Sequence, residues 1–224
     1  YPDLQCHFVT QTDRHGTGHA VELTKNLVGE DQVLIVLGDT IAEYDLKQVL
    51  EEPYSMLGVK KVDDPRNFGV AEVDEEGFIT RVVEKPAIPK SNMALVGIYK
   101  IMESNFLYAC LNKILSSTDN NNDFNLTDAL ECMIQQGAKF KYFKVSNWFD
   151  CGKKDIILQT NRNLLRQVDQ HQFANFERGN IIIQPVHIAA TAKVENSIIG
   201  PDVSIGEGAV ISRSVVKNSI IGQG

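Results

Sequence analysis

Two aspartates in this chain of 224 residues each follow a short apolar run. Asp39 follows Val33–Leu37 in V-L-I-V-L-G-D-T, and Asp150 follows Phe140–Val145 in a segment that ends W-F-D-C-G. Open α/β sheets carry ligand-binding groups at the carboxyl ends of their strands, and Mg²⁺ takes oxygen ligands, often one or two carboxylates with substrate phosphates. The pattern predicts that both aspartates hold Mg²⁺ for phosphate chemistry. Taken singly, each has a structural alternative, because Asp39 could begin a turn with Gly38 and Asp150 could cap a following helix.

Length and charge narrow the class of protein. A chain of 224 residues with 43% hydrophobic content can bury a real core, and its length falls between one large domain and two unequal ones. The formal net charge is −7, and no block rich in lysine and arginine is present, so a nucleic-acid partner is not expected. An anionic ligand must therefore be held by a metal ion and a few local donors, because the summed charge repels it.

The cysteines and the apolar segments indicate the cellular compartment of the protein. Four cysteines occur without C-x-x-C pairing, which indicates reduced thiols in a cytoplasmic protein, and Cys110 and Cys132 are expected in the core. No apolar stretch reaches the roughly 20 residues that span a bilayer, and the start does not resemble a signal peptide, so no membrane partner is expected. The chain begins without Met and enters a strand-like segment at once, which predicts that the natural amino-terminus lies further upstream.

Short apolar runs alternate with helical periodicities over the first part of the chain. The expected strands are 4–9, 33–37 and 55–62. A polar, glycine-bearing loop over 10–20 leads from the first strand into a helix that turns Val21, Leu23 and Leu27 inward, and a second helix covers 46–52. Such alternation is typical of a layered α/β sheet, whose strands are too continuously apolar to face water on one side.

The middle of the chain continues this pattern with a hairpin, two more strands and three helices. Residues 69–73 and 78–83 flank D-E-E-G, which predicts an antiparallel hairpin. The remaining expected elements are a buried strand over 93–101, helices over 106–115 and 125–137 on either side of a solvated loop, a strand over 140–145 and a helix over 153–168. The polar stretch 169–179 then predicts a domain boundary, between a core of residues 1–179 and a tail of residues 180–224.

The tail has a different periodicity. Branched aliphatic residues recur every five or six positions, at Ile188, Val194, Ile199, Ile205, Ile211, Val216 and Ile221. Such hexapeptide-like spacing places one aliphatic on each flat side of a three-sided coil, above its equivalent one turn away. The intervals from 188 to 205, 194 to 211 and 199 to 216 are each 17 residues, so the period holds on all three sides. It predicts about two coils, with an edge after Gly224 that a further coil or a partner subunit covers.

Seven short motifs resemble those of the sugar-phosphate nucleotidyltransferases, most closely the glucose-1-phosphate thymidylyltransferase group with a left-handed β-helical tail. They occur in family order: G-T-G-H-A at 16–20, L-G-D-T at 37–40, F-G-V at 68–70, V-E-K-P at 83–86, V-G-I-Y at 96–99, N-L-T-D at 125–128 and W-F-D-C-G at 148–152. The resemblance implies a Rossmann-like mixed-sheet α/β core that lacks its amino-terminal part, followed by a short left-handed parallel β-helix.

The resemblance also implies a reaction and roles for particular residues. In this family a sugar 1-phosphate attacks the α-phosphorus of a nucleoside triphosphate, here dTTP or UTP, and pyrophosphate leaves. The catalytic residues would be Asp39, Asp150 and Lys85, with both aspartates on Mg²⁺. The substrate-binding residues would be Gly16, Thr17, Gly69, Glu84, Lys85 and Gly97. The structural alternatives are a flexible loop at Gly16–Thr17, an exposed charge pair at Glu84–Lys85 and ordinary strand glycines at 69 and 97.

One departure from the family pattern concerns the nucleotide. The family begins with a glycine-rich loop that carries an arginine and wraps the triphosphate, and nothing of this loop stands before Tyr1. We therefore expect residues 1–224 alone not to catalyse the reaction efficiently, because glycine-rich backbone donors and a neighbouring cation are what hold a triphosphate.

Two other classes of protein remain open. One is a noncatalytic regulatory or assembly subunit of the same fold that binds a nucleotide sugar, although retention of Asp39, Asp150, Glu84 and Lys85 argues against it. The other is a hexapeptide-repeat acyltransferase, which needs more coils and a catalytic histidine, whereas the tail holds only His187, before its regular repeat. In each case the tail predicts a homo-oligomer. Neither the base nor the sugar is decided by the sequence.

Overall fold

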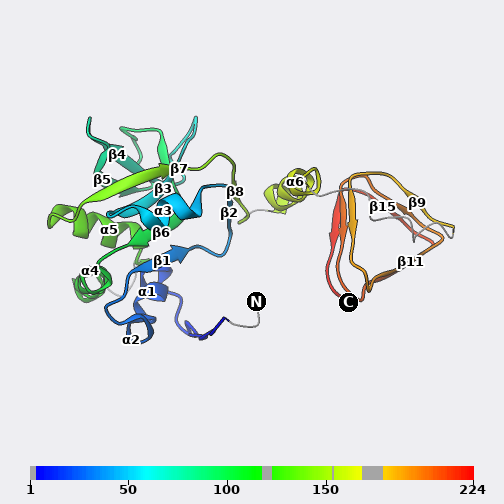
Figure 1. Cartoon of the computed structure of the whole chain (residues 1–224), viewed down its shortest axis with the longest axis horizontal. Coiled ribbons are helices and arrows are strands. Elements are labelled where there is room, and N and C mark those ends of the chain that lie inside the picture. The colour runs from blue at the N-terminus through cyan, green and yellow to red at the C-terminus, as the bar shows by residue number, and fades with distance from the viewer. Residues whose placement is uncertain (1–3, 118–122, 153, 168–178) are drawn as a thin grey trace. The chain divides into compact units, whose positions relative to one another are not determined.

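The computed structural model describes residues 4–117, 123–152, 154–167 and 179–224. The chain forms two compact units, residues 1–148 and 149–224, and each is described separately. The first unit is built on a mixed six-stranded sheet in the order β1-β6-β3-β7-β5-β4 (Figure 1). Its strands are β1 Val33–Val36, β3 Ser55–Lys61, β4 Gly69–Val73, β5 Phe78–Glu84, β6 Met93–Ile101 and β7 Phe140–Lys144. The pair β3–β7 is parallel, whereas β6 runs antiparallel to β1, β3 and β4.

Strand β6 is the centre of this sheet. All nine of its residues are buried, because both of its faces are covered. Leu95, Tyr99 and Ile101 contribute to the main core on one face, whereas Val96 and Ile98 pack with Val145 on the other. A strand covered on both sides needs continuous apolar sequence, which is why M-A-L-V-G-I-Y-K-I shows no polar alternation.

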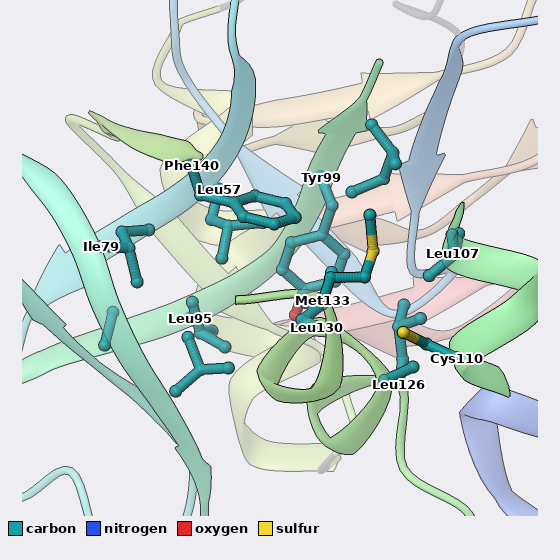
Figure 2. Close-up of a cluster of buried hydrophobic side chains, with 14 of the residues drawn as sticks. Leu57, Ile79, Leu95, Tyr99, Leu107, Cys110, Leu126, Leu130, Met133 and Phe140 are labelled. Atoms are coloured by element: carbon teal, nitrogen blue, oxygen red, sulfur yellow. The ribbon is translucent and has the colours of Figure 1, made fainter. Parts of the chain in front are cut away.

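Two helices cover one face of the sheet, α4 Ser104–Ser117 and α5 Leu126–Gln135. Figure 2 shows Leu130 and Met133 of α5 packed among Tyr99, Leu95 and Phe140 of the strands. Helix α5 begins after Asn125, as the sequence predicts, although the Asn125 side chain makes no capping hydrogen bond. The other helices of this unit are α1 Gly16–Glu22, α2 Lys25–Val28 and α3 Leu46–Glu51, and α3 is capped by Asp45, whose side chain accepts from the Gln48 backbone N–H.

Most expected elements are confirmed within one or two residues, including the hairpin of β4 and β5 around Gly77. The strand predicted over residues 4–9 is wrong, since this segment is exposed and has no strand structure. Its alternating pattern suits a strand, but a strand requires hydrogen-bonded partners, and the described residues provide none. The loop predicted up to residue 20 is shorter, because α1 begins at Gly16. Leu27, which was expected to point inward, is 52% exposed.

The second unit contains α6 Lys154–Leu165 and a coil of short parallel strands. The strands are β9 Ile181–Ile182, β10 Val186–Ile188, β11 Lys193–Glu195, β12 Ile198–Ile199, β13 Val203–Ile205, β14 Val210–Ser212, β15 Val215–Val216 and β16 Ser219–Ile221. They stack in three sheets, β10-β13-β16, β11-β14 and β15-β12-β9. The registers pair Ile188 with Ile205, Val194 with Ile211 and Ile199 with Val216, so the predicted 17-residue period is confirmed.

The two units divide earlier in the chain than the predicted boundary. The division lies between Trp148 and Phe149, whereas the predicted boundary falls largely on residues 168–178, which lie outside the described residues. Helix α6 groups with the coil because polar side chains join them: Arg162 bonds to Asn218 and pairs with Asp202 at 3.1 Å. Among the helices that the structure describes, none is long and apolar enough to cross a membrane.

Candidate functional site

A tight turn attached to β6 carries Asp39. The Leu37 backbone N–H donates to the Gly97 carbonyl at 2.9 Å, and the Thr40 N–H closes the turn onto the Leu37 carbonyl at 3.1 Å. The Thr40 hydroxyl donates to the Val96 carbonyl at 3.0 Å. The Asp39 side chain is exposed between these anchored positions, and among the described residues it has no hydrogen-bond or ion-pair partner. The contacts therefore hold the backbone of the turn in place, and the Asp39 carboxylate is free to bind a ligand.

Gly97 is the residue that lets this turn approach β6. Its φ is +78°, and an added Cβ would lie 2.8 Å from the Thr40 hydroxyl oxygen and 2.9 Å from Leu37 Cδ1. A side chain at this position would push the turn away from the strand. The sequence predicted that Gly97 lets backbone approach a sugar, and that role remains a prediction, whereas the structure gives Gly97 a role in placing Asp39.

A second group of predicted residues meets where β4 and β5 lie beside α5. Gly69 pairs with Glu84 across the two strands, and the Thr127 hydroxyl, in the first turn of α5, donates to Glu84 Oε2 at 2.7 Å. A Cβ on Gly69 would lie 3.2 Å from both of these oxygen atoms. The absence of a side chain at Gly69 thus leaves room for the bond between Thr127 and Glu84, which fixes one carboxylate oxygen.

Lys85 presents a cation beside the second oxygen of Glu84. Its backbone has a φ of +40° and donates to the Phe68 carbonyl at 3.1 Å. The Lys85 ammonium lies 3.6 Å from Glu84 Oε1, and its side chain is 63% exposed. An exposed pair of this kind contributes little to stability, about 0–1 kcal/mol. The ammonium can therefore exchange its partner for a phosphate at small cost.

Tyr99 completes this group and was not selected from the sequence. Burial raises the pKa of Tyr99 above its usual value, the negative charge of Glu84 raises it further, and a hydrogen bond with the Gly97 backbone partly offsets both. The hydroxyl therefore stays protonated and lies near Glu84 and Gly97. Tyr99 and Thr127 both lie in quoted motifs, V-G-I-Y and N-L-T-D, but neither was selected as a site residue, because an apolar strand and a helix start each account for the residue type.

The loop glycines at the start of α1 pack against the start of α5. Gly18 N–H donates to the Phe124 carbonyl at 2.7 Å, and the Thr17 hydroxyl accepts from the Leu126 N–H at 3.0 Å. A Cβ on Gly16 would lie 2.6 Å from the Phe124 carbonyl oxygen. These contacts account for Gly16 and Thr17 as structural residues that cap α5, and their predicted contact with substrate remains a prediction.

The segment before Asp150 is anchored by aromatic packing. Trp148 packs with the cluster of Val96, Ile98 and Val145, and its ring lies 4.9 Å from that of Phe68. Trp148 is therefore a structural residue that anchors this segment to the sheet. Asp150 accepts from the Gly152 N–H at 3.3 Å. Because Asp39 and Asp150 belong to separately described units, their sharing of one metal ion remains a prediction.

Lys100 of β6 is a buried lysine whose ammonium group bonds to backbone carbonyls. Lys100 is 2% exposed and donates to the Leu50 carbonyl at 2.9 Å. A cavity of about 400 Å³ between β1 and the helices α1 and α2 is lined mostly by apolar side chains such as Val21 and Val33, and its described lining includes hydroxyl groups but no cation for a phosphate. Within the described parts of the chain no three His, Cys, Asp or Glu side chains form a metal cluster. A metal ion held by Asp39 or Asp150 would thus need water or substrate oxygens as further ligands.

Residues 3–167 match the nucleotidyl transferase family, and the chain belongs to this family. It is 28% identical to the glucose-1-phosphate thymidylyltransferase of Streptomyces griseus over 99% of this chain and 68% of that protein. It is 35% identical to the bifunctional protein GlmU of Methanocaldococcus jannaschii over 91% of this chain and 44% of that protein.

The solved structures agree with the fold. A Bacillus anthracis protein described as a glucose-1-phosphate thymidylyltransferase, crystallised with sucrose, shares 26% identity and superposes with a TM-score of 0.59 over 71% of this chain and 64% of that one. A UDP-glucose pyrophosphorylase in complex with UDP-glucose has 22% identity and a TM-score of 0.60 over 72% and 66%, which bears on the fold alone. The chain thus spans between about half and two thirds of the length of these relatives.

Replacing Gly97 by alanine tests the contact that places Asp39. We expect Gly97→Ala to lower the free energy of unfolding by about 2–4 kcal/mol, because a strained backbone and overpacking each cost about 1–3 kcal/mol. Denaturant unfolding measures this change. Gly137→Ala is the matched control, since Gly137 has a φ of +96° but nothing within 4 Å of an added Cβ. An equal loss in both variants would show that the contact with Leu37 and Thr40 adds nothing.

Proposed function

We propose that the full-length protein joins a nucleoside triphosphate to a sugar 1-phosphate, producing a nucleoside diphosphate sugar and pyrophosphate. The observation that carries the proposal is the group of Gly69, Glu84 and Lys85 at the end of β5, where one carboxylate is positioned and one exposed cation stands beside it. The family membership and the names of the relatives support it. By analogy with those names, dTTP or UTP is the proposed nucleotide and glucose 1-phosphate the proposed sugar.

The chemistry requires positioning and charge neutralisation more than reactive side chains. A phosphate oxygen of the sugar 1-phosphate is already ionised near neutral pH, so it attacks the α-phosphorus in line without a protein nucleophile or a strong base. Lys85 neutralises charge on the sugar phosphate, and Glu84 accepts hydrogen bonds from sugar hydroxyls. Tyr99 keeps its hydroxyl protonated beside Glu84, so it remains a donor in the same group.

Asp39 and Asp150 are the proposed magnesium ligands. The donor set fits Mg²⁺, because hard cations prefer carboxylate oxygens together with phosphate and water. The exposed and unpartnered Asp39 carboxylate among the described residues fits as well. When bound, Mg²⁺ would screen the negative charges of the two phosphates that must approach each other. This acidic chain needs such screening more than a basic one would.

Replacing each aspartate by asparagine tests the magnesium proposal. We expect Asp39→Asn and Asp150→Asn each to lower Mg²⁺-dependent turnover of the full-length protein roughly a hundredfold or more, since a lost metal contact removes several kcal/mol of charge stabilisation. The assay measures pyrophosphate release with a panel of nucleoside triphosphates and sugar 1-phosphates. Asp74→Asn in the hairpin turn is the control and should keep parent activity. Near-normal turnover in both variants would contradict the assignment, and no turnover of the parent with any pair would favour a noncatalytic subunit.

Thr127 is proposed to position Glu84 for the sugar. Thr127→Val removes the hydroxyl but keeps the shape, and we expect it to raise the KM for sugar 1-phosphate roughly tenfold with a smaller change in kcat, because a hydrogen bond to a charged group contributes about 1.5–3 kcal/mol. Thr127→Ser should restore the parent KM. Thr24→Val is the control for the loss of a partly buried threonine hydroxyl, as the Thr24 hydroxyl bonds to the Val21 carbonyl and to the Tyr108 hydroxyl instead of Glu84. Parent KM values in Thr127→Val would show that the contact has no role in binding.

The three-sided coil is proposed to be a left-handed β-helix through which the protein forms a homo-oligomer. Val210 and Val215, on two different sides of the coil, are 73% and 70% exposed. We expect Val210→Asp or Val215→Asp to lower the native mass measured by light scattering, because a charge at a subunit interface is costly to bury. Thr80→Asp, on the exposed side of β5, is the control for an added charge. An unchanged mass in both valine variants would contradict oligomerisation through these sides.

A further inference from the structure

Two cysteine side chains from different helices meet under the sheet. Cys110 on α4 is 1% exposed, and Cys132 on α5 is partly exposed and packs against the same core. The side-chain amide of Gln136 donates to both sulfur atoms, at 3.4 Å from Cys110 Sγ and 3.0 Å from Cys132 Sγ. The two thiols are also direct neighbours, since the Cys132 thiol raises the pKa of Cys110. The other two cysteines lie elsewhere, with Cys6 exposed and Cys151 beside Thr160.

We propose that Cys110 and Cys132 are a dithiol that a peroxide converts into a disulfide joining α4 to α5. Disulfides require Cβ atoms about 3.5–4.5 Å apart. The shared Gln136 amide donor and the packing of α4 on α5 make the two thiols neighbours, as such a bond requires. The proposal concerns a site of covalent modification, and it stands independently of the proposed nucleotidyl transfer.

The arrangement assigns different roles to the two sulfur atoms. Cys132 is the one that solvent reaches, so its thiolate attacks hydrogen peroxide, an S–O bond forms, the O–O bond breaks, and a sulfenic acid and water result. Burial, followed by the neighbouring Cys132 thiol, raises the pKa of Cys110 to about 12, so Cys110 remains a thiol until its neighbour is oxidised. Its sulfur then attacks the sulfenic sulfur, the S–S bond forms, and the hydroxyl leaves as water with the Cys110 proton. Two thiols and one peroxide thus give one disulfide and two waters.

The bond would restrain the helix that positions the candidate site. Helix α5 carries Thr127, which bonds to Glu84, and Glu131, whose Oε2 accepts from the Val82 N–H of β5 at 2.8 Å. A covalent link from Cys132 to α4 therefore holds both α5 contacts to the strand that ends at Glu84. The oxidised protein should unfold at a higher temperature than the reduced protein, by roughly 5 °C or more, because a cross-link restricts the unfolded chain.

Peptide mapping after peroxide treatment tests the proposal. The full chain is treated with hydrogen peroxide, its remaining thiols are alkylated, and it is digested without reductant. We expect one linked pair of peptides containing Cys110 and Cys132, lighter by two hydrogen atoms than the sum of the separate peptides and released by dithiothreitol. A Cys6→Ser/Cys151→Ser variant should give the same product, with the two peptides linked within one chain.

Single variants separate the two roles. Under the same treatment Cys110→Ser should accumulate a sulfenic acid at Cys132 that dimedone traps, whereas Cys132→Ser should leave Cys110 available for alkylation after unfolding. Gln136→Leu should slow disulfide formation severalfold, because it removes the shared N–H donor. The proposal is overturned if both thiols remain free under conditions that oxidise Cys6 in the unaltered chain, or if Cys110 and Cys132 become linked only between two chains.

Discussion

The hydrogen bond from Leu37 to the Gly97 carbonyl is the contact on which the candidate site depends. This bond joins the residue after β1 to β6, all of whose residues are buried, and it holds the turn that carries Asp39. The Thr40 hydroxyl makes a second contact with the same strand. These contacts form only because Gly97 lacks a side chain and has a positive φ. A residue whose backbone the fold fixes in advance loses less conformational entropy when it binds a ligand.

The second half of the site depends on the packing of α5 against the hairpin. Thr127 and Glu131 lie on α5 and bond to the end and the middle of β5, so a helix that packs through Leu130 and Met133 also orients a polar group. The same helix start accepts the loop at Gly16 and Thr17. A single packed helix therefore connects two of the segments in which the sequence placed substrate-binding residues.

The net negative charge of the chain gives these polar contacts their importance. A protein with a formal charge of −7 cannot attract phosphate through its overall field. The described residues use Lys100 to bond backbone carbonyls and leave Lys85 exposed beside Glu84. Binding of an anionic ligand therefore depends on where a few charges are placed, which is a property of the tertiary structure.

The sequence by itself determined where the local helices, strands and turns form, because the spacing of apolar residues specifies them. The buried strand 93–101, the hairpin around Gly77, the start of α5 after Asn125 and the 17-residue repeat of the coil all followed from residue patterns, because each depends on neighbours or on a fixed period. The motifs were also sufficient to select Asp39, Glu84 and Lys85 as candidates. The strand predicted at 4–9 is wrong because a strand forms only when a partner strand bonds to it, and a local residue pattern does not report whether such a partner is present.

Only the tertiary structure decided how these candidates are held. Thr127 of α5 and Tyr99 of β6 lie near Glu84 of β5, and no local pattern reports contacts between residues so distant in the chain. Gly97 was selected for a sugar, yet its contacts are with the turn at Asp39. Helix α6 groups with the coil because Arg162 bonds to Asn218 and pairs with Asp202. Long-range packing sets these contacts, whereas the sequence specifies only the pieces that pack.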